Sequence, residues 1–317
     1  MIDQETVQKG FAQGDIRRIQ KADMSSLTHL QGGGTGGRLS PGQATKFMTD
    51  SVVSQSSFLK DVEEIRMTED RYNLDDLTIA SRVTRKGTEN TAGTRTAATT
   101  TQRNMTAIET VLSYGVSYQF VEDNIERGGV KNTLQSLFGI IMANDSEDLA
   151  INGDEADAGA DAAFLTINDG WLKIITGEAG VHTYVLAGSD YIGTIFPGMI
   201  AQLPLKWKNS PSRPALLITQ TAYEGYLAQL QALGTRLADD VLAGGSFPVF
   251  WGYQVRPLRY LSAGMLFTPP KNLVWGWHAR NMSLEVDRDI EARTHIVVLT
   301  SRADFEIKQP DAIVYGT

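Results

Sequence analysis

Histidine is the side chain most often used for metal binding and for acid–base chemistry near neutral pH. This chain has four, and they are scattered: His29, His182, His278 and His295. None has a second histidine three or four positions away, the spacing that places two ligands on one helix face. The chain has no cysteine, which excludes disulfides, thiolate metal sites and a cysteine nucleophile. We therefore interpret the histidines as structural or surface residues, and we predict no metal and no cofactor.

A glycine-rich run could cradle a phosphate. Five glycines lie between positions 32 and 37, but Gly37 is followed by Arg38, Leu39 and Ser40. A phosphate-binding P-loop needs a lysine and a hydroxyl residue directly after its last glycine. Without the lysine, we favour a flexible hinge in an extended arm over the phosphate-binding alternative.

An acidic loop follows position 152, and it could bind a cation. It contains Asp154, Asp157 and Asp161, and seven acids and no base lie between Asn144 and Asp161. The spacing does not match the alternating ligands of a calcium loop, and no glutamate stands at the twelfth position. We interpret the loop as a solvated turn, with calcium binding, or contact with a basic segment of another subunit, as alternatives.

A second charged cluster lies near the C-terminus and alternates in sign along an apparent strand or hairpin. We interpret it as cross-strand ion pairs on a solvated face. Its members are Asp287, Asp289, Glu291, Arg280, Arg288 and Arg293. The chain contains no Gly-x-Ser-x-Gly elbow and no His-Glu-x-x-His motif, so we predict that it is not an enzyme.

Bulk properties restrict the class of protein. The chain has 317 residues, 42% hydrophobic and 21% charged, which is typical of a globular protein with one large or two ordinary domains. No apolar run is long enough for a membrane helix, and the polar N-terminus does not resemble a signal peptide. The net charge of −8 argues against general nucleic-acid binding, although a container that lines nucleic acid would tolerate it.

The segment between positions 66 and 127 is the most unusual part of the chain. Strand patterns at 62–84 and 105–120 flank a threonine-rich stretch with almost no large apolar residues. The window 77–108 contains five basic residues and one acid, a net charge of +4: the basic residues are Arg82, Arg85, Lys86, Arg95 and Arg103. Such a segment cannot form a core of its own, so it is either a disordered loop or a β-hairpin that lies on an acidic neighbouring subunit. We predict that the five basic residues make inter-subunit contacts.

A long helix is predicted directly after this segment. Residues at helical spacing form one apolar stripe from Val130 to Ile151, and Asn152-Gly153 ends it. Further on, 213–219 reads as a buried strand, and a helix capped by Thr221 and Glu224 follows it. Ser189-Asp190 is predicted to cap another short helix. The remainder, from 247 on, is mostly strand, so the fold class is α+β.

Taken together, these parts resemble the major capsid proteins of tailed bacteriophages, which have the HK97-like fold. The stretch SYQFVEDNIERGGVKNTLQSLFGIIMANDSEDLAINGDE resembles the strand, spine helix and closing loop of that family. Three further stretches resemble the segments that, in that family, lead from the axial domain back into the peripheral sheet. They are FPVFWGYQVRPLRYLSAGMLF, NLVWGW and SRADFEIKQPDAIVYG. No lysine–asparagine crosslink can be matched, so that family feature is not carried over. The resemblance implies an N-terminal arm and docking helix at 1–65, an extended hairpin loop at 66–108, a peripheral domain at 109–187 and 271–317 with the spine helix at 130–151, and an α/β axial domain at 188–270.

The resemblance also implies a function. The chain is expected to self-assemble through hexamers and pentamers into an icosahedral shell around double-stranded DNA, which it encloses without sequence-specific binding. The implied partners are copies of itself and scaffolding, portal and decoration proteins, with assembly in the host bacterial cytoplasm and a place in the virion capsid. The alternatives are an encapsulin-like nanocompartment shell protein, a soluble α/β enzyme whose site residues converge only in three dimensions, and a phage tail-tube or adaptor protein.

Overall fold

The computed structural model describes residues 47–78, 99–119, 130–233 and 247–317, together with the isolated residues 42, 45, 84 and 86. The chain divides into two compact units, each assembled from segments that are distant in the sequence. The first unit comprises Met1–Gln55, Glu109–Asn144 and His278–Arg302. The second comprises Ser56–Ile108, Asp145–Trp277 and Ala303–Thr317.

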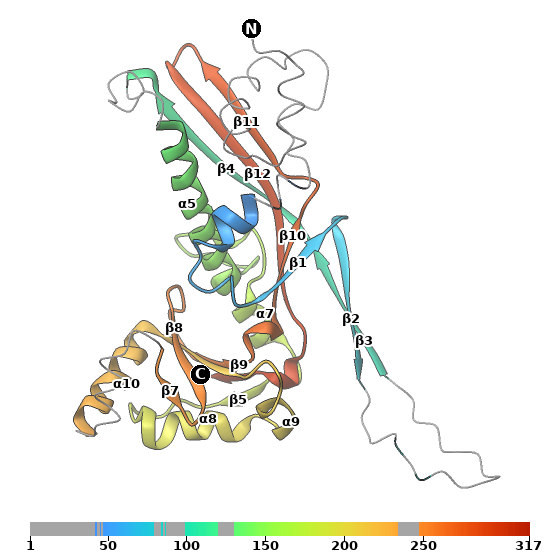
Figure 1. Ribbon diagram of the computed structural model, residues 1–317, viewed down its shortest axis with the longest axis vertical. Helices are drawn as coiled ribbons and strands as arrows, with labels where there is room; N and C mark the ends of the chain where they lie inside the picture. The colour runs from blue at the N-terminus through green and yellow to red at the C-terminus, as the bar shows by residue number, and fades with distance from the viewer. Residues whose placement is uncertain are drawn as a thin grey trace, which may run out of the picture. The chain divides into compact units, whose positions relative to one another are not determined.

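Strands β2 (Arg71–Thr78) and β3 (Thr99–Thr106) form a two-stranded antiparallel hairpin and lie side by side in Figure 1. The register places Arg71 opposite Thr106 and Thr78 opposite Thr99. Four of the eight residues of β3 are threonines, whose branched side chains suit an extended backbone. Among the described strands, β2 and β3 pair only with each other.

The longest described helix, α5, runs from Val130 to Asn152 and confirms the helix predicted from the apolar stripe. The helix ends at the predicted position, but for a different physical reason. Gly153 does not have the positive φ of a left-handed helix cap. Instead, a Cβ atom at Gly153 would lie 2.2 Å from the carbonyl oxygen of Asn168 and 2.7 Å from that of Leu149. Glycine is required because two backbone segments pass each other here.

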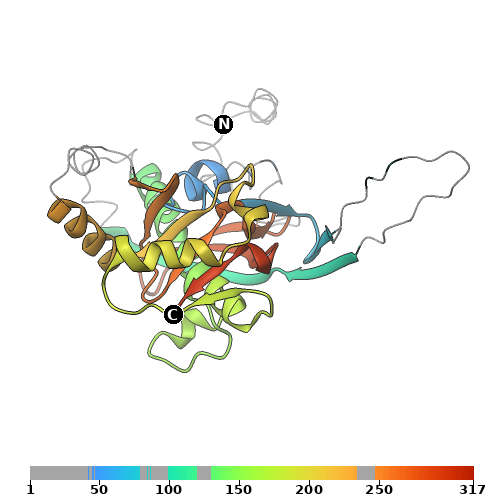
Figure 2. The same ribbon diagram turned by 90° about the horizontal axis from the view of Figure 1, so that it is seen from below.

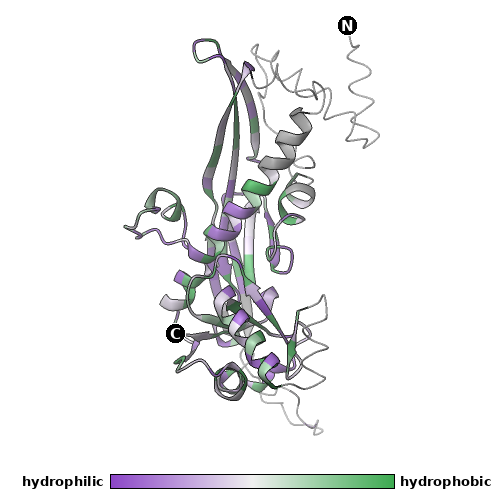
Figure 3. Ribbon diagram, turned by 90° about the vertical axis from the view of Figure 1, so that its left-hand side faces the viewer, coloured by the Kyte–Doolittle hydropathy of each residue, from purple (hydrophilic) through white to green (hydrophobic). Residues whose placement is uncertain are grey.

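A five-stranded sheet is organised around the long strand β12. Its order is β1-β10-β12-β11, and β4 also pairs with β12. Half-buried and exposed residues alternate along β4, and Figure 3 shows mixed hydropathy along the long strands. The register pairs Asp287 with Ile296 and Asp289 with Thr294, so both carboxylates stand directly opposite uncharged residues. The strand bounds are Glu63–Met67 (β1), Ile108–Ser117 (β4), Leu273–His278 (β10), Ser283–Asp289 (β11) and Thr294–Ile307 (β12).

The second unit contains a six-stranded mixed sheet of order β5-β13-β9-β6-β8-β7. Its central strand β6 has four buried residues in succession and confirms the buried strand predicted at 213–219. β6 pairs in parallel with β8 and antiparallel with β9, which is typical of mixed α/β units. The bounds are His182–Tyr184 (β5), Ala215–Thr219 (β6), Val249–Phe250 (β7), Tyr253–Leu258 (β8), Met265–Thr268 (β9) and Val314–Gly316 (β13).

Two helices cover this sheet: α8 (Phe196–Gln202) contacts β5 and β13, and α10 (Gln220–Leu233) contacts β6 and β8, as Figures 1 and 2 show. The short helices are α6 (Ala162–Leu165), α7 (Trp171–Gly177) and α9 (Leu205–Lys208). Single turns of 3-10 or π-helix lie at Met48–Val53 (η2), Tyr191–Ile195 (η3), Pro270–Asn272 (η4) and Pro310–Ala312 (η5).

The caps of two of these helical segments test the sequence predictions. The Asp190 carboxylate accepts a hydrogen bond from the backbone N–H of Gly193 at 2.9 Å, which confirms the cap predicted at Ser189-Asp190. The capping box predicted at Thr221 and Glu224 is wrong. Helix α10 begins at Gln220, so Thr219 occupies the cap position and its hydroxyl accepts from the N–H of Ala222 at 3.1 Å.

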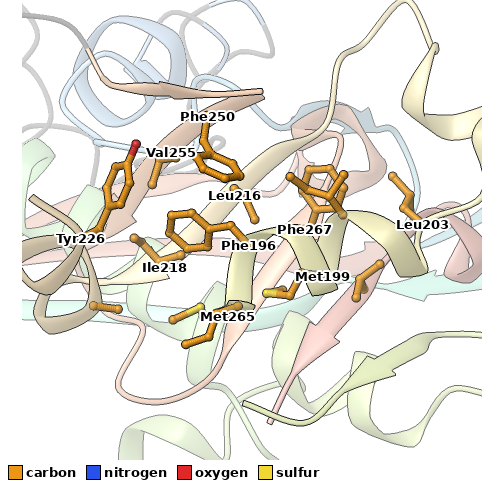
Figure 4. Packing of buried hydrophobic residues seen from close by; sticks show 14 residues of the cluster. Phe196, Met199, Leu203, Leu216, Ile218, Tyr226, Phe250, Val255, Met265 and Phe267 are labelled. Atoms are coloured by element: carbon orange, nitrogen blue, oxygen red, sulfur yellow. The ribbon is translucent and has the colours of Figure 1, made fainter. Parts of the chain in front are cut away.

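The core of the second unit lies between this sheet and its helices (Figure 4). Phe196 of α8 packs against Phe250 with ring centroids 5.4 Å apart and against Tyr226 of α10 at 5.1 Å. Leu216 and Ile218 of β6 belong to the same core and are fully buried. The predicted boundary of the axial domain falls inside this sheet, because β13 pairs with β9 and β5 pairs with β13, and both β5 and β13 lie outside 188–270.

Candidate functional site: the hairpin root and its anchors

The root of the β2–β3 hairpin is held by an internal ion-pair network centred on Arg103. The Arg103 guanidinium contacts the carboxylate of Glu178 and, at 3.1 Å, that of Glu306 in β12. Only 12% of the Arg103 side chain is exposed, whereas an inter-subunit contact would need it on the surface. This differs from the prediction that Arg103 contacts another subunit, because its guanidinium pairs with acids of its own chain.

A buried carboxylate lies beside this network. Asp304 of β12 is 8% exposed and accepts hydrogen bonds from the backbone N–H of Thr106 and, at 2.8 Å each, from the Asn168 side-chain amide and its neighbour Phe305. One oxygen serves Thr106 and the other serves Asn168 and Phe305. Asp304 thus joins the last residue of the hairpin to β12 and to the loop that precedes α7 (Trp171–Gly177).

Burial controls the acidity of these groups. Desolvation raises the pKa of Asp304 to about 6, although its three hydrogen bonds oppose the shift. Desolvation also raises the pKa of Glu306, and Arg103 opposes that shift. Asp304 consequently changes its charge in a mildly acidic range, where an exposed aspartate stays ionised.

The other predicted contact residues lie between β2 and β3 in the sequence. Lys86 is exposed. Arg82, Arg85 and Arg95 fall outside the described residues. The structure therefore distinguishes Arg103, whose side chain is largely covered by its ion-pair partners, from the exposed Lys86.

A second buried carboxylate, Glu147 of α5, anchors the turn that leads into β1. Glu147 is 1% exposed and accepts four hydrogen bonds from three successive residues. The donors are the hydroxyl of Ser56, the hydroxyl and the backbone N–H of Ser57, all at 2.5 to 3.0 Å, and the backbone N–H of Phe58 at 3.3 Å. The turn at 56–58 is thereby fixed to helix α5.

Arg256 of β8 ties the same turn to the six-stranded sheet. Its guanidinium contacts the Asp61 carboxylate at 2.6 Å and lies 5.7 Å from the ring centre of Phe58 and 5.0 Å from that of Phe247. The side chain is 9% exposed, so this pair is more strongly coupled than a surface ion pair. The segment 56–61 is therefore held from two directions.

Both edges of the six-stranded sheet expose apolar side chains. At the β7 edge, Phe247, Val249 and Trp251 are 44%, 54% and 67% exposed, and Trp251 has a positive φ of 49° in the β7–β8 turn. At the β5 edge, Val185 is 73% exposed. Natural sheets normally protect their edges with charge or with another chain, so these edges are suited to contact with another molecule.

The remaining chemistry-bearing residues take structural roles. His182 hydrogen-bonds the Asp311 carboxylate at 3.0 Å, and the Nδ1 atom of His278 accepts the N–H groups of Arg280 and Asn281. A hydrogen bond from Lys173 lowers the pKa of Asp154 in the acidic loop. Within the described part of the chain, no group of three or more histidines and acids is arranged to hold a metal ion. No described helix has the length and apolar content to cross a membrane.

Sequence reasoning missed the residues that hold the hairpin root: Asp304, Asn168, Glu178 and Glu306. Arg103 was predicted as a contact residue, but its partners in its own chain were not predicted. The available signal was weak: Asp304 and Glu306 flank Phe305 in a mixed polar and apolar strand near the end of the chain. Nothing in the sequence connects it with Thr106, which lies 198 positions away.

No protein-family model matches the chain. The chain is 26% identical over 311 residues to the provisionally named prophage capsid protein YqbE of Bacillus subtilis (strain 168). The match covers 93% of this chain and 96% of that protein.

Among solved structures, the fold is similar to that of a chain of the satellite phage P4 procapsid that includes the size determination (Sid) protein. The TM-score is 0.65 at 12% identity, over 96% of this chain and 97% of that chain. It is also similar to a capsid chain of an empty GTA particle computed with C5 symmetry, with a TM-score of 0.57 at 13% identity, over 83% and 89%. At these identities the likeness establishes the fold, which is shared over nearly the full length with the P4 procapsid chain.

Proposed function

We infer that this chain is a capsid protein of the bacteriophage type, a structural subunit that assembles with copies of itself into a shell. The observation that carries this conclusion is the match to a prophage capsid protein along almost the whole of both chains. The likeness in fold to procapsid and capsid chains supports it independently. The absence of a recognisable catalytic motif in the sequence is consistent with a structural role.

The described contacts support the proposal that the shell is completed by contacts between copies. The β2–β3 hairpin has no other strand beside it among the described residues, and its residues are largely polar. A two-stranded hairpin is marginally stable alone, so packing on a neighbour would stabilise it. The exposed apolar side chains at both edges of the six-stranded sheet are further candidates for such contacts.

The finer description of the assembly is our proposal. Copies form hexamers and pentamers, which close into an icosahedral shell with the HK97-like arrangement. The shell encloses double-stranded DNA without reading its sequence, and the acidic net charge of −8 suits a wall that does not grip the DNA. Scaffolding, portal and decoration proteins are the expected partners, and assembly takes place in the host bacterial cytoplasm before the chain becomes part of the virion.

The layout of the parts is also a proposal: a spine helix with a peripheral sheet, an axial domain, an N-terminal arm and an extended loop at 66–108. The strand pairing suggests one refinement. Because β13 and β5 complete the sheet that contains β6, the axial domain should include 182–184 and 314–316 in addition to 188–270. Exposed apolar edges would then belong to the axial domain on both sides.

Particle formation tests the function directly. The full chain, expressed alone or with the proteins encoded beside it, is expected to form closed particles or large rings that negative-stain electron microscopy and light scattering detect. Repeated subunit contacts, each weak, would sum to a stable shell. Stable monomers or dimers under both conditions would contradict the proposal, and tubes would favour the tail-tube alternative.

The basic residues that lie between β2 and β3 in the sequence provide a second prediction. Changing Arg82→Gln, Arg85→Gln and Lys86→Gln together is expected to raise the subunit concentration needed for assembly about tenfold. Each exposed ion pair contributes ~0.5 kcal/mol, and three of them approach the 1.4 kcal/mol of a tenfold change. Particle yield is measured by sedimentation at several salt concentrations.

The matched control keeps every charge: Arg82→Lys, Arg85→Lys and Lys86→Arg. This variant should assemble as the natural chain does. If the neutral variant assembles equally well at low salt, these three charges have no contact role.

A further inference from the structure

We propose that Asp304 and Arg103 are positioning residues that fix the direction in which the β2–β3 hairpin leaves its own subunit. The inference deepens the proposed function, since it rests on the hairpin being a contact between copies. It also assigns Arg103 a role different from that of the basic residues further along the hairpin. Those would touch a neighbour, whereas Arg103 acts on its own chain.

The first argument is geometric. A hairpin attached only by its two strand ends can pivot about them, unless further contacts at the root restrain it. Here Thr106, the last residue of β3, donates its N–H to Asp304, and Arg103, three residues earlier, contacts Glu306 on the same strand β12. Two attachment points on one rigid strand define a direction, which a single point cannot do.

A third element completes the restraint. Asn168 holds the other oxygen of Asp304 at 2.8 Å, and Glu178, on the far side of α7, contacts Arg103. Helix α7 is itself fixed, because the indole of Trp171 donates to the carbonyl of Val274 in β10 at 3.1 Å. The root of the hairpin is therefore clamped between β12 and the segment 168–178.

The second argument is energetic. Asp304 is buried with no cation among its hydrogen-bond donors, and such a carboxylate costs free energy to desolvate. An apolar residue would be cheaper if filling space were the only requirement. A carboxylate here provides what an apolar side chain cannot, namely two acceptor oxygens that join three backbone segments.

Protonation should loosen this clamp. The oxygen that accepts from Thr106 cannot do so equally well once it carries a proton. The charged groups around the site are Arg103, Glu306 and Glu178, and the arginine keeps its charge throughout. Because burial raises the pKa of Asp304 to about 6, the change falls between pH 7 and pH 5.

The effect of Asp304 protonation on the stability of the whole fold distinguishes local opening of the hairpin root from global unfolding. A carboxyl whose folded-state pKa is raised binds its proton more readily in the folded chain than in the unfolded one. Acidification through pH 6 toward pH 4 therefore adds stability from this group. A faster amide exchange at the root in that range cannot come from Asp304 weakening the whole fold.

The test compares Asp304→Asn with the natural full-length chain by hydrogen–deuterium exchange and mass spectrometry of the unassembled subunit. Asparagine matches the shape of aspartate but turns an N–H group toward Thr106 or toward Asn168 and Phe305. Exchange in the peptide covering 99–107 is expected to accelerate about tenfold, as one charge-assisted hydrogen bond is lost. Exchange in β6 should not change. Glu109→Gln, which removes an exposed carboxylate paired with Arg302, is the control and should leave both peptides unchanged.

A second measurement needs no variant. In the natural chain, exchange of 99–107, corrected for the intrinsic effect of pH, should become faster as the pH falls from 7 to 5. Asp304→Asn should weaken this pH dependence, and what remains is due to Glu306, whose pKa burial also raises. Particle yield of Asp304→Asn at pH 7 should fall. Unchanged exchange at the root overturns the proposal, and so does faster exchange with unchanged particle yield. If the natural chain forms no particles, the proposed function fails, while the exchange result still decides whether the root is clamped.

Discussion

Replacing Glu147 with alanine is expected to destabilise the subunit by about 3–5 kcal/mol, because it removes the buried acceptor of four hydrogen bonds, two of which come from the buried residues Ser56 and Phe58. The donors belong to Ser56, Ser57 and Phe58, and the carboxylate that serves them is 1% exposed. A hydrogen bond to a charged group contributes about 1.5–3 kcal/mol, and stranded donors add a desolvation cost. The total is a large fraction of the stability of an ordinary domain.

Urea denaturation of the unassembled subunit, followed by circular dichroism, measures this loss. Glu147→Gln should cost less, about 1–2 kcal/mol, because the amide retains one acceptor oxygen and the Ser57 hydroxyl can turn to accept from its nitrogen. Asp145→Asn is the matched control on the same helix, since Asp145 is exposed. It should change stability by less than about 0.5 kcal/mol.

The turn held by Glu147 also supports an aromatic contact. Phe58 packs edge-on against Trp171 with ring centroids 6.0 Å apart, so loss of the turn would open one side of that aromatic contact. If alanine at 147 is tolerated within about 1 kcal/mol, the four hydrogen bonds do not hold the turn at 56–58, and the anchor assigned to α5 is wrong.

Gly153→Ala is the second change with a large expected effect, a loss of about 3 kcal/mol or more. The added methyl group would lie 2.2 Å from the Asn168 carbonyl oxygen and 2.7 Å from that of Leu149. Both are backbone atoms, which cannot rotate away as a side chain could. The contact is reciprocal, because the N–H of Gly170 donates to the carbonyl of Gly153 at 2.8 Å.

Gly177→Ala is the matched control. A Cβ atom at Gly177 meets nothing within 4 Å, and the residue is the last of helix α7. Alanine has a higher helix propensity than glycine, so this change should be neutral or stabilise by up to about 1 kcal/mol. Thermal unfolding of the two variants side by side gives the comparison. Equal melting temperatures would show that the backbone segments at 153 and 168–170 separate at little cost.

Gly153 also shows how far sequence reasoning extends. The sequence located the helix end, because an apolar stripe stops there and Asn-Gly follows it. It could not supply the reason, since the crowding atoms belong to residues 168 and 170. The same limit explains the misplaced cap of α10: Thr219 and Thr221 are both plausible from local pattern, and only the backbone path decides between them.

The sequence by itself determined the α+β class, the long helix predicted from Val130 to Ile151, the buried strand β6 and the resemblance to phage capsid proteins. These features depend on the periodicity and order of apolar residues, which are local properties of the chain. Only the tertiary structure decided which charges face outward. Arg103 and Lys86 look equivalent in a basic, threonine-rich segment, yet the Arg103 side chain is only 12% exposed and pairs with Glu178 and Glu306, while Lys86 is exposed. The physical reason is that an ion pair depends on distance in space, and the partners of Arg103 lie 75 and 203 positions away along the chain.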